Sequence, residues 1–434
     1  MSPHEIPSRT APPDSGTLLL SGARLTDGRT VDVRLSGPRI EAVGTAGSLA
    51  VESGRPADRT RIDLNGYLLL PAPAEPHAHL DLALTADGPP PAGAREIQRR
   101  ATEAALLQLG HGATALRTHV RIGDVQGLRA LEAVLQARNA LRGLVDVQAV
   151  AVPRLLTGVA GAEGLAMARD ALKMGASVAG GCPDLDPDPS GYAEAVLSLA
   201  AEFGAPVDLH TAASDPARLA RLAAMAGGLR PGVTLGPCHG LGALSAHEAA
   251  RTAERLAAAG VSVAALPQGG CAVLERGGVA PVRLLRTAGV RVTAGSGALG
   301  DLANPVGRGD PLEAAFLLAT HGECDATRSY ETVSTQARAV LGLPEVRVEA
   351  GFPAELLAVR GETVAGVLSL GYSRIVIHRG RVVSRTSAVR EFSDGHGSYG
   401  PGAYGPTSYG TASDAGDAAG DTGPGLPRQA HREA

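Results

Sequence analysis

The chain has 434 residues, of which 44% are hydrophobic and 19% charged, so it carries enough apolar content for a large packed core. Its formal net charge is −4 and no basic stripe appears, so nucleic acid is not expected as a partner. No apolar run reaches the roughly 18 residues that a membrane span needs, so no membrane partner is expected either.

The first residues and the cysteine usage predict a cytoplasmic protein. Residues 1–16 are rich in Pro and Ser and are expected to be disordered, and they lack the basic and apolar regions of a signal peptide. The four cysteines show no CxxC spacing, as is typical of reduced thiols in the cytoplasm.

Short strand-like pieces fill residues 17–70, and "VDVRL" among them alternates apolar and polar residues as a half-buried strand does. Strand-like pieces occur again in residues 346–390, where "SRIVIHRGRVVSR" predicts a hairpin around Arg379-Gly380. We therefore expect the two segments to form one small β-sandwich domain that is discontinuous in sequence.

Residues 71–345 repeat a helical run, a Gly and a short apolar strand, as in "ALKMGASVAGG" and "LAAAGVSVAAL". The Gly suits the left-handed residue that ends a helix, and strands that are apolar throughout suit a parallel sheet buried on both faces. One helix should begin at Ser245, which forms a capping box with Glu248. Eight strands alternating with helices predict a (β/α)8 TIM barrel, with strands at residues 68–74, 113–119, 146–152, 176–181, 206–210, 233–238, 261–266 and 290–295.

The last segment, residues 391–434, is rich in Gly, Ser, Tyr and Pro. Such a composition cannot bury enough apolar surface to fold, so this segment is expected to be a disordered tail.

Four of the twelve histidines fall at the predicted C-terminal ends of barrel strands, where barrel enzymes keep their functional residues. His77 and His79 follow the first strand in "PHAHLD", His210 ends the fifth in "PVDLH", and His239 ends the sixth in "LGPCH". A lone histidine at a strand end is usually structural. Four with this spacing indicate descent from a metal centre, because neutral imidazole is the commonest nitrogen ligand of metals.

The motifs "PHAHLD", "RTHV" and "VDLH", with the flanking β segments, resemble the amidohydrolase superfamily and most closely its cytosine deaminase-like branch. The resemblance implies a barrel of the metallo-dependent hydrolase type, in which zinc or iron activates water for attack on a ring carbon of cytosine or a related cyclic amidine or amide. At matching motif positions it implies His77, His79 and His210 as metal ligands. It also implies His239 as the catalytic residue that polarises or positions the substrate and the water.

Two further residues match positions of this family that face the substrate. Arg154 in "AVPRLL" stands where the family has a substrate-binding Gln, and His119 belongs to the "RTHV" motif. His119 is thus expected to line the pocket, with a structural role behind the ligands as the equal alternative.

Two carboxylates that the resembled family needs are replaced in this chain. The acid of its HxxE pattern, which moves a proton to the substrate ring, falls at Ala213, and the metal-binding Asp that ends the eighth strand falls at Gly297. Each lost acid–base group is expected to lower the rate about 10²–10⁴-fold.

Two interpretations follow. The first is a metal-dependent hydrolase of C–N bonds in a nucleobase-like small molecule, with altered catalytic residues. The second is a catalytically inactive pseudoenzyme that acts as a ligand-binding or scaffold protein and has either kept or lost its divalent metal. The resemblance favours the first, and the missing carboxylates favour the second and predict very weak or no cytosine deamination. Barrels of this family commonly self-associate, so a homo-oligomer is also an expectation.

Overall fold

The computed structural model describes residues 17–49, 59–89, 92–123, 127–269, 271, 274 and 277–389. The predictions for residues 1–16 and 391–434 lie outside these ranges, and the described elements belong to the compact unit Met1–Ala388. None of the helices in these ranges combines the length and hydropathy that crossing a bilayer requires.

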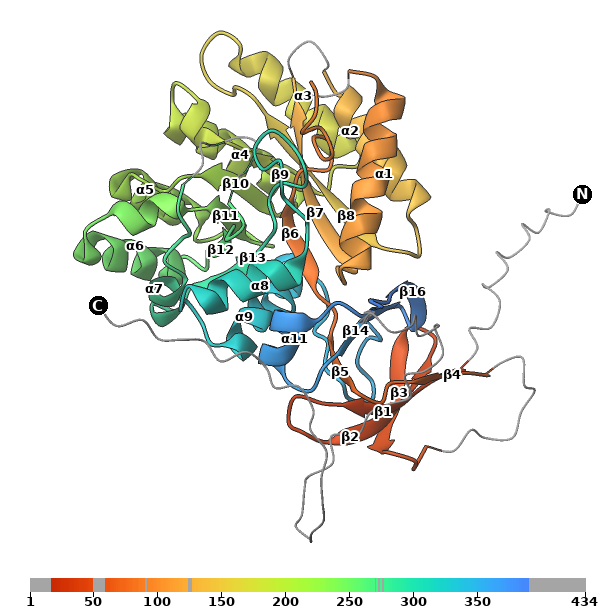
Figure 1. The fold of residues 1–434 in the computed structure, drawn as a ribbon. Coiled ribbons are helices and arrows are strands. Elements are labelled where there is room, and N and C mark those ends of the chain that lie inside the picture. The colour runs from red at the N-terminus through yellow and green to blue at the C-terminus, as the bar shows by residue number, and fades with distance from the viewer. Residues whose placement is uncertain are drawn as a thin grey trace, which may run out of the picture. The chain divides into compact units, whose positions relative to one another are not determined.

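Eight parallel strands form the predicted barrel, and each is hydrogen-bonded to the next in chain order (Figure 1). A bridge between Ala78 and Gly297 joins the two ends of the series, and the Gly297 N–H donates to the His77 carbonyl at 3.0 Å. The prediction of a TIM barrel is therefore confirmed. Its strands are β6 (Ala74–Ala78), β7 (Ala115–Ile122), β8 (Asp146–Pro153), β9 (Val178–Gly181), β10 (Val207–Thr211), β11 (Val233–Pro237), β12 (Ser262–Ala265) and β13 (Arg291–Ala294).

Helices separate most of the strands and pack their apolar faces on the barrel (Figure 1). The capping box of Ser245 and Glu248 is present. Gly175 and Gly204 end their helices in the left-handed conformation, as the repeated sequence pattern of helix, Gly and strand predicts. The helices are α1 (Ala94–Gly110), α2 (Arg129–Ala140), α3 (Gly161–Met174), α4 (Pro189–Phe203), α5 (Pro216–Ala226), α6 (Ala246–Ala258), α7 (Val282–Thr287), α8 (Pro311–Thr320), α9 (Ala326–Val333), α10 (Thr335–Val340) and α11 (Val364–Leu370), with the 3-10 turns η3 (Pro183–Leu185) and η4 (His239–Ala243).

A second, mainly antiparallel sheet combines strands from both sides of the barrel sequence, as predicted. The pairing of β5 with β14 joins the two halves. The predicted hairpin turns at Arg379-Gly380, where both residues have positive φ, 50° and 74°, as a tight two-residue turn requires. The strands of this small sheet are β1 (Thr17–Arg24), β2 (Thr30–Ser36), β3 (Arg39–Thr45), β4 (Arg59–Asp63), β5 (Tyr67–Pro71), β14 (Leu356–Arg360), β15 (Arg374–His378) and β16 (Arg381–Thr386).

The first predicted barrel strand, residues 68–74, is wrong in its position. The structure divides this stretch, so that β5 belongs to the small sheet and the barrel begins with β6. Pro73 lies in the break, and a proline cannot donate to a strand ladder. As a consequence, His77 lies within the first barrel strand and not after it.

A buried pair between Glu355 and His378 makes the small sheet sensitive to acid. The Glu355 carboxylate lies 2.8 Å from Nδ1 of His378 and accepts the Arg379 N–H at 3.0 Å. Burial alone would raise the pKa of Glu355, but these contacts outweigh it and hold the pKa below its ordinary value of 4.5. Because the folded pKa is the lower one, the stabilisation is present above about pH 4.5 and is lost as the pH falls through the folded pKa.

We therefore expect Glu355→Gln to be less stable than the wild type at neutral pH by about 1–3 kcal/mol. The difference should shrink on acidification, because the wild type alone loses this contribution. Urea unfolding at about pH 7 and about pH 3.5 measures both values. A stability difference that is the same at the two pH values would contradict the expectation.

Candidate metal centre

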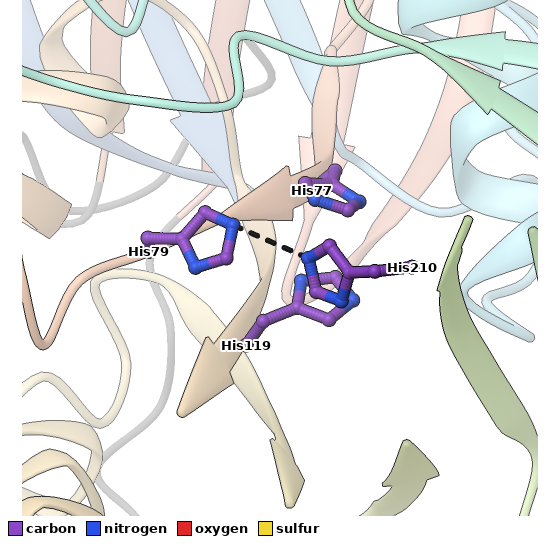
Figure 2. A group of neighbouring side chains, drawn as sticks. All are labelled: His77, His79, His119 and His210. Atoms are coloured by element: carbon purple, nitrogen blue, oxygen red, sulfur yellow. Dashed lines mark hydrogen bonds between the residues drawn. The ribbon is translucent and has the colours of Figure 1, made fainter. Parts of the chain in front are cut away.

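Four buried histidines meet at the C-terminal end of the barrel (Figure 2). His77 lies on β6 and His79 follows it, so their rings leave an extended stretch of chain on the same side. His119 comes from the neighbouring strand β7, and His210 comes from β10. All four side chains are at most 2% exposed, so the site is shielded from solvent.

The spacing of the ring nitrogens fits a single divalent ion. One nitrogen from each ring lies within 4.8 Å of the corresponding nitrogen of every other ring. Nε2 of His79 and Nε2 of His210 are 3.4 Å apart. Two nitrogen ligands of a tetrahedral zinc ion, each 2.0–2.1 Å from the metal, are also about 3.4 Å apart.

The rings of His77, His79 and His210 are in the protonation state that a metal requires. Burial is the main cause that lowers the pKa of His77 and of His79 far below the ordinary value, and the neighbouring imidazoles lower it further. Burial likewise lowers the pKa of His210 to about 3. Both ring nitrogens of His77, and Nδ1 of His79 and of His210, have no hydrogen-bond partner among the described residues. Neutral, unpartnered imidazoles fit a divalent metal, which would satisfy polar atoms that are costly to bury alone.

Asp208 lies behind His119, and the sequence had not indicated it as a site residue. Its Oδ1 is 3.1 Å from Nε2 of His119, and its Oδ2 accepts a hydrogen bond from Nη1 of Arg117 at 3.0 Å. Burial alone would raise the pKa of Asp208, but His119 and Arg117 hold it below the ordinary value, so the carboxylate is charged. The available signal was the strand alternation in "VDLH", which directs Asp208 to the same side as His210.

Glu75 fixes the backbone beside His77. Its buried carboxylate accepts the N–H groups of His77 and of Ser296, each at 2.9 Å, and so ties β6 to the loop after β13. Burial raises the pKa of Glu75 to about 7. A Cβ atom on Gly295 would lie only 2.5 Å from this carboxylate, so the close approach of the two segments requires glycine there.

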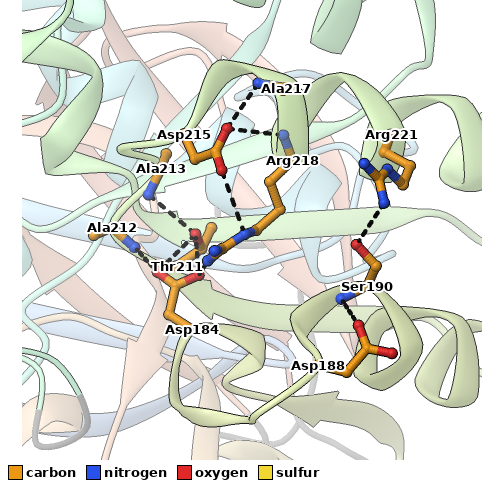
Figure 3. A network of polar contacts seen from close by, with 10 residues as sticks. All are labelled: Asp184, Asp188, Ser190, Thr211, Ala212, Ala213, Asp215, Ala217, Arg218 and Arg221. Atoms are coloured by element: carbon orange, nitrogen blue, oxygen red, sulfur yellow. Dashed lines mark hydrogen bonds and ion pairs between the residues drawn. The ribbon is translucent and has the colours of Figure 1, made fainter.

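Ala213 and Gly297, which the resemblance places where its family has two carboxylates, are buried and adopt left-handed backbone. Ala213 has φ of 60° and Gly297 has φ of 71°. Two acids near Ala213 are engaged in local contacts (Figure 3). Asp184 accepts the Ala212 N–H at 2.8 Å and the Thr211 hydroxyl, and Asp215 caps α5. Within the described ranges, no carboxylate belongs to the group of four imidazoles.

His239 does not belong to this group, although we expected it to converge with His77, His79 and His210. Cys238 adopts a left-handed conformation, φ 56°, directly after β11, and the chain turns into η4. The half-buried ring of His239 then packs against Gly277, where an added Cβ would lie 2.0 Å from Cδ2 of the ring. The fourth imidazole is His119, which the sequence placed either at the pocket wall or in a structural role behind the ligands.

Arg154, predicted to bind substrate, is exposed just after β8. It lines a cavity of about 260 Å³ together with Ile122 and Gly123 at the end of β7 and residues of α3. The assignments of Arg154 to the substrate and of His239 to catalysis remain predictions.

No family model matches the chain. A pterin deaminase from Rhizobium rhizogenes is 25% identical over 422 residues, which cover 87% of this chain and 96% of that protein. The N-isopropylammelide isopropyl amidohydrolase of a Pseudomonas species is 29% identical over 180 residues, which cover 35% of this chain and 44% of the relative.

Solved structures show the same architecture. N-isopropylammelide isopropylaminohydrolase from Burkholderia multivorans matches 86% of this chain and 99% of its own, with a TM-score of 0.74 and 26% identity. A 5-methylcytosine deaminase from Klebsiella pneumoniae, liganded with 5-fluorocytosine, shares the fold over 86% of this chain and 99% of its own, with a TM-score of 0.75 and 24% identity. The chain is thus similar over most of its length to a curated deaminase, and it shares its architecture with solved deaminases of the amidohydrolase superfamily.

Proposed function

We propose that the chain holds a divalent metal, zinc or iron, through His77, His79 and His210, and hydrolyses a C–N bond of a nucleobase-like cyclic amidine or amide. The observation that carries the proposal is the convergence of buried, neutral imidazoles at the C-terminal end of a barrel, which is where this fold keeps its active sites. The names of the relatives, a deaminase of a pterin and an amidohydrolase of an ammelide, support a heterocyclic small molecule as the substrate. A cytoplasmic location and self-association are also part of the proposal.

The chain's own groups set the scale of the expected activity. A divalent metal in the centre would supply a Lewis acid that activates water. The proposal assigns His239 and Arg154 to the substrate, at the ends of β11 and β8. Proton transfer is the weak step, because Ala213 and Gly297 stand where the resembled family has its two acids. Each acid contributes about 10²–10⁴-fold, so turnover should be slow.

A second candidate is a pseudoenzyme that binds a small heterocycle without converting it. The observation that favours it is the absence of a carboxylate from the imidazole group, within the part of the chain that the structure describes.

Ammonia release by the zinc-loaded and iron-loaded full chain tests the proposal, with cytosine, a pterin and an aminotriazine as substrates. The proposal predicts slow release that stops when a chelator removes the metal. Binding of metal and heterocycle without any ammonia would favour the pseudoenzyme. A protein that binds neither metal nor heterocycle would contradict both candidates.

Restoring the two acids offers a sharper result. We expect the double variant Ala213→Glu, Gly297→Asp to raise the rate of ammonia release by on the order of 10²-fold or more, since both general acid–base groups return. The aspartate adds a Cβ at a φ of 71°, which costs about 1–2 kcal/mol of stability.

The matched control is Ala213→Gln, Gly297→Asn, which has the same shape but cannot transfer protons as a carboxylate does. Equal rates for the acid and amide double variants would show that the restored carboxylates do not reach the reacting atoms.

A further inference from the structure

We infer that His119 is itself a ligand of the metal, held by Asp208 as its positioning residue, so that the Asp208–His119 pair replaces the carboxylate ligand that Gly297 cannot supply. The inference rests on the proposed function, because it concerns the same metal. It goes beyond that function by adding a fourth protein ligand. It also names Asp208 as the carboxylate that supplies the negative charge which Gly297 cannot.

The ring positions support a common centre for all four imidazoles. An ion 2.0–2.1 Å from a ring nitrogen is about 3.2 Å from the centre of that ring. Two such rings are then about 4.5 Å apart at a right angle and about 5.2 Å apart at the tetrahedral angle. The His119 ring lies 4.0 Å from His77, 4.5 Å from His210 and 5.5 Å from His79, so each separation is within about 0.5 Å of one of these two values.

The topology explains how one ligand can replace the other. Ala78, which lies between His77 and His79, pairs with Gly297 on one side and with Thr118 on the other. The lost ligand position at Gly297 and the residue His119 thus flank the same strand, β6. Without a ligand at Gly297, the coordination of the ion is incomplete on the side of β13. A side chain from β7, on the other side of β6, can reach the same ion.

The charges support the same assignment. An imidazole has two nitrogens, so His119 can face Asp208 with Nε2 and offer Nδ1 to an ion. A carboxylate behind a ligating histidine orients the ring and strengthens it as a ligand. Asp208 is itself fixed by Arg117, which also bonds to the Gln148 side chain and the Val340 carbonyl. All three residues of the Arg117–Asp208–His119 series are at most 1% exposed, so these contacts are shielded from bulk solvent.

X-ray absorption by the zinc-loaded full chain counts the imidazoles bound to the metal, and a titration against a chelating dye gives the affinity. We expect four imidazoles in the wild type and three in His119→Ala, with an affinity loss of more than about 10-fold in that variant. Asp208→Asn should keep four imidazoles and lose about 10-fold in affinity. His247→Ala, which removes an exposed imidazole from α6, is the matched control and should equal the wild type in both measurements.

Addition of free imidazole separates a lost ligand from a damaged fold. Imidazole should restore the zinc affinity of His119→Ala, because it can enter the space that the ring leaves, and it should not change the affinity of the wild type. Absence of this rescue would overturn the assignment of His119.

Three imidazoles in the wild type, with an unchanged affinity in His119→Ala, would overturn the inference and leave the proposed function intact. An affinity of Asp208→Asn equal to that of the wild type would overturn the positioning role of Asp208. A wild-type chain that binds neither zinc nor iron would instead overturn the proposed function together with the inference.

Discussion

Replacement of His79 by alanine is expected to lower the zinc affinity of the chain by more than about 100-fold, because loss of even an outer-shell partner of a metal ligand costs about 10–100-fold. His79 is the ring whose Nε2 lies 3.4 Å from Nε2 of His210, at the spacing of two ligands of one ion. The His79 side chain is 2% exposed, and its Nδ1 has no hydrogen-bond partner in the described chain. The variant therefore removes a buried metal ligand without breaking a hydrogen bond of Nδ1. A competition titration with a chelating dye measures the affinity directly.

The control for this variant is His247→Ala, which removes an exposed imidazole from α6. Its zinc affinity should equal that of the wild type. The same distinction should appear in thermal unfolding, because an ion that binds only the folded state raises the unfolding temperature. Equal zinc affinity for His79→Ala and His247→Ala would contradict the assignment of the metal to the imidazole group.

Replacement of Arg374 by methionine is expected to lower the free energy of unfolding by about 3–5 kcal/mol, the usual cost of breaking a buried ion pair on one side. Arg374 lies on β15 of the small sheet, and it holds both carboxylate oxygens of Asp310 at 2.8 and 2.7 Å. The Asp310 carboxylate in turn caps α8 of the barrel through the Leu312 N–H. The variant leaves this carboxylate largely buried without its cation.

Arg99→Met on α1 is the matched control, since Arg99 pairs with Glu96 and Glu103 on the surface and its side chain is 59% exposed. Pairs of this kind contribute about 0–1 kcal/mol. Urea unfolding of both variants gives the two values. Similar losses in the two variants would mean that the contact between α8 and the small sheet adds little to the stability of the barrel.

The barrel could be predicted from the sequence because its determinants are local. Parallel strands that are buried on both faces leave short apolar runs, and helices that end in left-handed residues leave Gly before those runs, as at Gly175 and Gly204. The capping box at Ser245 and the hairpin at Arg379-Gly380 are also set by neighbouring residues. Strand-like sequence occurs both before and after the barrel, which was enough to predict that the two outer segments join in one sheet.

The sequence was least informative where a feature depends on one backbone angle or on distant partners. The left-handed conformation of Cys238 directs His239 into η4, and no periodic pattern reports such a turn. The role of Asp208 depends on Arg117 and His119 from another strand, which only the closed barrel brings together. The first strand was misplaced because "YLLLPAPAEPHA" is apolar across the break at Pro73, so composition alone does not divide it.

Crystals of the zinc-loaded protein, measured at the zinc absorption edge, test the metal centre most directly. We predict one anomalous peak per chain, enclosed by the ring nitrogens of His77, His79, His119 and His210. A zinc-loaded crystal with no peak among these four rings, or with its peak on other residues, would contradict the account.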